Sequence, residues 1–118
     1  MFQPAMKTFY DANGYLVVPS VFKPSEFAGI HHRVQEFISD PQKAPEGVSI
    51  GREGDTVKDK TSPEARNTSI RALAFLVRFD PIFRTFAKQT LLLDLVRGLI
   101  GARIKVFRDQ MLLKPPGG

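Results

Sequence analysis

One stretch near the C-terminal end decides how the whole chain is interpreted: Ile104-Lys105-Val106-Phe107-Arg108-Asp109-Gln110-Met111-Leu112-Leu113, followed by Lys114-Pro115-Pro116-Gly117-Gly118. Valine, isoleucine, leucine and phenylalanine crowd its first part, and neither glycine nor proline interrupts it. This composition predicts a β-strand over residues 104–113. Pro115 and Pro116 cannot donate to a central ladder, so the strand must end before them.

The two faces of this predicted strand differ in polarity. Successive side chains of a strand point to opposite sides, so alternate residues share a face. One face would carry Ile104, Val106, Arg108, Gln110, Leu112 and Lys114. Polar groups partway along a strand face are unusual in a packed core and typical of a cavity wall, where they bind a small anion.

Helical patterns cover most of the remaining chain. The clearest begins at Pro24, where the missing N–H of proline costs nothing, and Glu26 complements the helix dipole. Apolar residues then recur three, four and seven positions apart, which predicts one buried stripe. The predicted helices are residues 6–13, 24–38, 70–79, 81–88 and 91–100, and a further strand is predicted over residues 15–18.

Helix ends are marked by residues suited to capping. Gly14 and Gly101 follow apolar periodic segments, where a left-handed or terminating glycine is favoured. Asp80 followed by Pro81 is a good N-cap and first helical residue, and Thr90 is predicted to cap the next helix. The alternation of helices with the first strands of a sheet indicates an α+β fold.

Residues 39–69 form the least regular part of the chain, with several prolines and glycines, many charges and few large apolar residues. So long a stretch without a pattern is typical of either a functional lid or a mobile loop, and both interpretations stay open. A brief strand over residues 48–50 is the only regular element predicted there.

Composition excludes several classes of protein. A chain of 118 residues, 42% of them hydrophobic, is long enough for one domain. The absence of cysteine excludes disulfides and thiolate metal sites. No apolar run could span a bilayer, and residues 1–7 lack the core of a signal peptide, so we expect a cytoplasmic protein without a membrane partner. The net charge of +5 is scattered over the chain, so no nucleic-acid partner is expected.

The two histidines do not predict a metal site. His31 and His32 are neighbours on a predicted helix, where side chains project about 100° apart, so both cannot bind one ion from that helix. No His-x-Asp or His-x-Glu pair occurs in the chain. The residues alone therefore indicate neither a metal ligand nor a catalytic group.

A series of short motifs carries a resemblance to a known family. In order along the chain these are Phe9-Tyr10-Asp11-Ala12-Asn13-Gly14-Tyr15-Leu16-Val17-Val18-Pro19, Pro24-Ser25-Glu26, Asp80-Pro81, Leu99-Ile100-Gly101 and Lys114-Pro115-Pro116-Gly117. Their order and spacing resemble the N-terminal part of the phytanoyl-CoA dioxygenase family, which are Fe(II)- and 2-oxoglutarate-dependent oxygenases. The resemblance touches nearly the whole chain except residues 39–68.

The resemblance implies a fold and an activity for a parent protein. The fold would be a double-stranded β-helix, or jelly roll, with helices packed outside it, of which this chain would supply an incomplete part. In the family an iron-binding His-x-Asp pair follows the Lys-Pro-Pro-Gly turn, so residues 1–118 would be a fragment ending before it. We therefore expect Fe(II), 2-oxoglutarate and a small-molecule substrate in the parent, and neither tight cofactor binding nor turnover by this chain.

The resemblance also suggests which residues contact 2-oxoglutarate. Gln110 and Lys114 would face its carboxylates from the closing strand, and Arg71, with Arg78 as its competitor, would reach them from the segment before Asp80. The alternatives are a strand-end charge for Lys114, a polar edge for Gln110 and a surface salt bridge for either arginine. Residues 39–69 would lie near the mouth of the site. A helical interaction module and a basic nucleic-acid-binding domain are the other functional classes.

Overall fold

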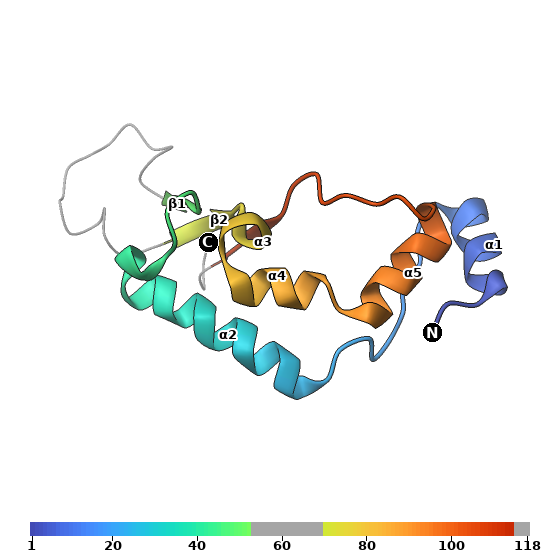
Figure 1. Ribbon diagram of the computed structural model, residues 1–118, viewed down its shortest axis with the longest axis horizontal. Coiled ribbons are helices and arrows are strands. Elements are labelled where there is room, and N and C mark those ends of the chain that lie inside the picture. Colours follow the sequence, from blue (N-terminus) through green and yellow to red (C-terminus); the bar gives the residue numbers. More distant parts are fainter. Residues whose placement is uncertain (53–69, 115–118) are drawn as a thin grey trace.

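The computed structural model describes residues 1–52 and 70–114 (Figure 1). They form a mixed arrangement of helices and one small antiparallel sheet, as the α+β prediction requires. The elements are α1 (Pro4–Asn13), α2 (Pro24–Ser39), the 3₁₀ turn η1 (Pro41–Lys43), β1 (Ser49–Arg52), β2 (Ile70–Ala74), α3 (Leu76–Phe79), α4 (Pro81–Ala87), α5 (Thr90–Ile100) and β3 (Gln110–Leu112).

The sheet lies at one end of the molecule and the α1–α5 pair at the other (Figure 1). Its strand order is β1-β2-β3, and both pairings are antiparallel. Leu73 at the centre of β2 pairs with Ile50 on β1 and with Met111 on β3. These three apolar residues therefore share one face of the sheet, and α2 covers that face.

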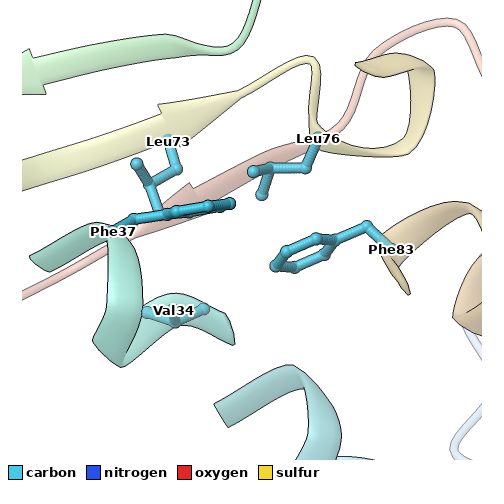
Figure 2. Packing of buried hydrophobic residues seen from close by; sticks show 5 residues of the cluster. All are labelled: Val34, Phe37, Leu73, Leu76 and Phe83. Atoms are coloured by element: carbon cyan, nitrogen blue, oxygen red, sulfur yellow. The ribbon is translucent and has the colours of Figure 1, made fainter. Parts of the chain in front are cut away.

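The core forms between this face and the helices. Val34 and Phe37 of α2 meet Leu73, Leu76 and Phe83, which come from β2, α3 and α4 (Figure 2). Phe37 and Leu73 are fully buried. The buried pair on α2 lies within the stripe predicted from its periodicity, whereas Phe27 at one end of the stripe and Ile38 at the other stay partly exposed.

Asp80 ties α2 to α4 from inside the protein. Its carboxylate accepts hydrogen bonds from the N–H groups of Ile82 (2.9 Å) and Phe83 (3.4 Å), which confirms the predicted N-cap. It also accepts from Arg33 Nε of α2 at 2.8 Å. Arg33 in turn donates to Glu36 at 2.8 Å, so a buried aspartate is satisfied by one cation and two backbone donors.

The predicted glycine caps are confirmed at the C-terminal ends of α1 and α5. Gly14 ends α1 in the left-handed region at φ 78°, and its N–H donates to the carbonyl of Tyr10. Gly101 ends α5 at φ 105°. The N-cap of α5 is Gln89, so Thr90 is the first helical residue and not the cap that the sequence suggested.

Two predicted strands are shorter than expected or absent. Residues 15–18 join α1 to α2 without entering a sheet, and the closing strand is reduced from residues 104–113 to β3, Gln110–Leu112. The physical reason is the lack of a neighbour: within the described ranges no strand lies beside residues 104–109 or 15–18. Val17, Val106 and Phe107 remain exposed as a result.

The helix predicted over residues 70–79 is wrong. β2 occupies Ile70–Ala74, Phe75 turns the chain through the left-handed region at φ 62°, and only Leu76–Phe79 is helical. Pairing with a strand on each side overrides the helix propensity of alanine and leucine. The strand predicted over residues 48–50 is confirmed as β1.

The described sheet has three strands, fewer than the jelly roll that the resemblance implies. Most of the suggested lid over residues 39–69 lies outside the described residues. Among the described helices, none is both long enough and apolar enough to cross a membrane.

Candidate anion-binding site

Three cationic side chains line one cavity on the sheet. The cavity has a volume of about 550 Å³, and its cations are Arg52 at the end of β1, Arg71 on β2 and Lys114 just after β3. The other lining residues are Gly51, Ala72, Leu112 and Leu113, so no acidic residue is among the described ones that line it. Three cations around one cavity make an anion the natural candidate ligand.

Strand pairing explains how this cavity forms. Gly51, Ala72 and Leu112 are paired across the three strands, so two of the three side chains in this row are small or absent. A Cβ built on Gly51 would lie 3.4 Å from Cβ of Ala72, an ordinary contact distance. Small residues on this row leave a hollow on the sheet that larger side chains would fill.

A register shift places Arg71 beside the hollow. Gly51 pairs with Ala72, but Arg52 pairs with Ile70, so Arg71 is the extra residue on β2. Such a bulge redirects side chains. Ile70 accordingly packs against the core, while Arg71 lines the cavity together with Ala72. The N–H of Leu113 donates to the carbonyl of Arg71 at 2.7 Å and holds Lys114 near it.

The structure thus brings together two of the three residues singled out from the sequence. Arg71 and Lys114 line the same cavity, whereas Gln110 does not line it. Gln110 pairs with Ala74 at the other end of β3, where its side chain is exposed. Alternation still places Gln110 on the strand face that carries Leu112 and Lys114.

Arg78 is separated from this group. It lines a smaller cavity of about 290 Å³ with Arg108 and Asp109, and its guanidinium lies 5.1 Å from the ring centroid of Phe79. Of the two arginines that the sequence left in competition, Arg71 is the one beside Lys114.

Sequence reasoning missed Arg52. It stands at the edge of the irregular stretch over residues 39–69, where no periodicity identified its neighbours. The only local signal was the brief strand predicted over residues 48–50, which, extended by two residues, would have included it. Its proximity to Arg71 depends on the β1–β2 pairing, which connects residues far apart in the chain.

The histidines lie away from this cavity. His31 and His32 are exposed on α2, which packs against the other face of the sheet. His32 Nε2 is 3.9 Å from Glu36 Oε1, within the helix. In the part of the chain that the structure describes, no group of three or more His, Cys, Asp or Glu residues could hold a metal ion.

The fold and the cavity define an α+β domain with a cationic hollow on its sheet. Comparison with known proteins narrows this description. Residues 10–118 match the family model for phytanoyl-CoA dioxygenase, so the chain belongs to this family. The suspected resemblance is confirmed over all but the first residues.

A curated relative supports the same assignment. A probable phytanoyl-CoA dioxygenase of Caenorhabditis elegans is 25% identical over 114 residues, which cover 93% of this chain and 35% of that protein. The chain therefore spans about a third of the length of the relative it matches. No solved structure matches the chain.

Proposed function

We propose that this chain contributes the cosubstrate-binding wall of an Fe(II)- and 2-oxoglutarate-dependent dioxygenase that hydroxylates a small molecule. Family membership supports the dioxygenase class. The observation that carries the assignment of the site is the convergence of Arg52, Arg71 and Lys114 on one cavity.

The three cations suit a carboxylate such as one end of 2-oxoglutarate. A guanidinium presents paired N–H donors that match the two oxygens of a carboxylate, and an ammonium adds a compact charge. Leu113 stands opposite Arg71 across the β2–β3 pair, and Lys114 follows it directly. Both cations line the same cavity, so both can reach one ligand group. Gln110, farther along the same face of β3, would offer an amide donor to a more distant part of the ligand.

The described residues do not fit an iron site. They form no cluster of metal-binding side chains, and both histidines lie on the helix that covers the opposite face of the sheet. The role proposed for Arg52, Arg71 and Lys114 is to bind and orient the dicarboxylate.

Titration of the purified chain with 2-oxoglutarate, followed by NMR chemical shifts of the β2 and β3 amides, tests the proposal. We expect weak binding of 2-oxoglutarate, because only the three cations of this chain would contact it and no iron would chelate it. The shifts should cluster at Ala72, Leu112 and Leu113. Loss of a charge-assisted hydrogen bond should weaken binding about tenfold in Arg71→Ala and in Lys114→Ala.

Arg78→Ala is the matched control, because Arg78 is an exposed arginine of the same segment that lines the other cavity. It should bind 2-oxoglutarate as the wild type does. Equal weakening in Arg71→Ala and Arg78→Ala would show a non-specific charge effect and would contradict the proposal. Unchanged amide shifts around the cavity at saturating ligand would contradict it as well.

A further inference from the structure

Three successive backbone N–H groups donate hydrogen bonds to Asp109. The N–H of Phe75 donates to its carbonyl oxygen at 3.4 Å. The N–H groups of Leu76 and Val77 donate to its carboxylate oxygen Oδ2 at 2.6 Å and 3.2 Å. One residue just before β3 therefore holds the corner between β2 and α3, more than thirty positions earlier in the chain.

This corner is a firm anchor. Phe75 adopts the left-handed region at φ 62°, which is uncommon for a residue with a side chain. The first N–H groups of α3 have no partner within the helix, and the Asp109 carboxylate supplies one. Leu76 at the start of α3 is 3% exposed and belongs to the core. The hydrogen bonds of Asp109 to this corner therefore fix Asp109 relative to the core.

β3 itself is too short to hold its own register firmly. It pairs with β2 through Ala72–Leu112, Leu73–Met111 and Ala74–Gln110. Residues 102–109 before it enter no ladder with any described part of the chain. A slip by one residue would turn every side chain of a strand to the other face. Met111 would then leave the core side, and Lys114 would leave the side of the cavity.

We propose that Asp109 is a positioning residue that sets the register of β3 and thereby holds Lys114 beside Arg71. Asp109 lines the smaller cavity and not the cationic one, so it acts on the anion site only through the strand that follows it. The effect on ligand binding rests on the proposed function, whereas the effect on register does not.

The experiment compares Asp109→Ala and Asp109→Asn with the wild-type chain by amide hydrogen exchange and by 2-oxoglutarate titration. Asp109→Ala should speed exchange roughly tenfold at Leu76, Val77 and Leu113, and should weaken 2-oxoglutarate binding to a similar degree. Asp109→Asn keeps a side-chain oxygen that accepts hydrogen bonds, so it should restore most of both properties.

Asp40→Ala is the matched control. Asp40 also caps a short turn, because its Oδ1 accepts from the N–H of Gln42 at 3.1 Å, but this bond stays within its own turn at the end of α2. Its removal should leave Leu113 exchange and ligand affinity unchanged. A general loss of stability would change Leu113 exchange in Asp40→Ala as much as in Asp109→Ala.

The outcomes separate the two proposals. Unchanged exchange at Leu113 in Asp109→Ala, or an Asp109→Asn variant as damaged as Asp109→Ala, overturns the positioning role. If Asp109→Ala does not fold, Asp109→Asn decides alone: retained protection at Leu113 supports the role and lost protection overturns it. If the wild type binds no 2-oxoglutarate, the proposed function fails, while exchange at Leu113 still tests the register.

Discussion

Single residues with several partners hold the helical layer together. Asp80 is fully buried and receives two backbone N–H groups and Arg33, and Arg33 lies 4.6 Å from the ring centroid of Phe37. Burying a carboxylate is costly unless it is paired and hydrogen-bonded. Asp80 meets both conditions, because it caps α4 and forms an ion pair with Arg33 while fully buried.

Removal of the Asp80 side chain should be strongly destabilising. In Asp80→Ala, α4 loses its cap and Arg33 loses a buried partner, which together should lower the free energy of unfolding by about 3 kcal/mol. Urea denaturation followed by circular dichroism measures the change. Asp80→Asn retains a cap oxygen and should lose less. A change below about 0.5 kcal/mol in Asp80→Ala would contradict this role.

Glu36 predicts a dependence of stability on pH. The hydrogen bond from Arg33 is the main cause that lowers the pKa of Glu36 below its usual value, although desolvation opposes the shift. A pKa lowered by folding contributes stability above the unfolded-state pKa, and this contribution is lost as the pH falls through the folded-state pKa. The free energy of unfolding should therefore fall on acidification below about pH 4.3.

The variant Glu36→Gln isolates this effect. It cannot titrate, so its unfolding free energy should fall less steeply with acid than that of the wild type. Urea unfolding at several acidic pH values provides the comparison. Parallel curves for the two proteins would show that Glu36 does not contribute to the acid dependence.

At the scale of elements, aromatic and glycine contacts decide how the helices meet. Phe22 of the connection before α2 stacks on Phe86 of α4, with ring centroids 4.4 Å apart, and Phe27 of α2 packs against both rings. At the far end, the ring of Phe2 lies directly over Gly98 of α5. A side chain at position 98 would occupy the space of that ring.

Gly98→Leu should release α1 from α5. Leucine is a better helix former than glycine, so α5 itself should remain helical while the Phe2 ring is displaced. Phe2→Ala removes a half-buried ring and should cost about 1 kcal/mol. Limited proteolysis and hydrogen exchange over α1 give the readout. The double variant should be hardly worse than either single one, because both remove the same contact; additive losses would contradict the contact.

At the scale of the whole molecule, exposed apolar side chains occur at both ends, and three of them lie on the segment that leads into β3 and on β3 itself. Val106, Phe107 and Leu112 are 61%, 100% and 73% exposed. β1 and β3 are the outer strands of the described sheet, and unpaired strand edges with apolar neighbours favour pairing between molecules. The red segment from α5 to β3 runs along the outside of the molecule (Figure 1).

We therefore expect the isolated chain to self-associate through the sheet end, where the strand edges lie beside these exposed apolar side chains. Phe107→Ser should shift a concentration series in analytical ultracentrifugation toward the monomer. Ile100→Ser is the matched control, because Ile100 is 63% exposed but lies at the α1–α5 end. A chain that stays monomeric at every concentration, or one that responds equally to both substitutions, would contradict this expectation.

Local sequence pattern was sufficient for α2 and α4 and for the capping roles of Gly14, Asp80 and Gly101, because helical hydrogen bonds and caps join residues only a few positions apart. The family assignment likewise followed from short motifs. Only the tertiary structure decided that residues 70–74 form a strand, that β3 spans three residues, and that Arg52 and Lys114 line the same cavity as Arg71. Strand pairing depends on partners far along the chain, and a register shift of one residue moves a side chain to the other face of the sheet.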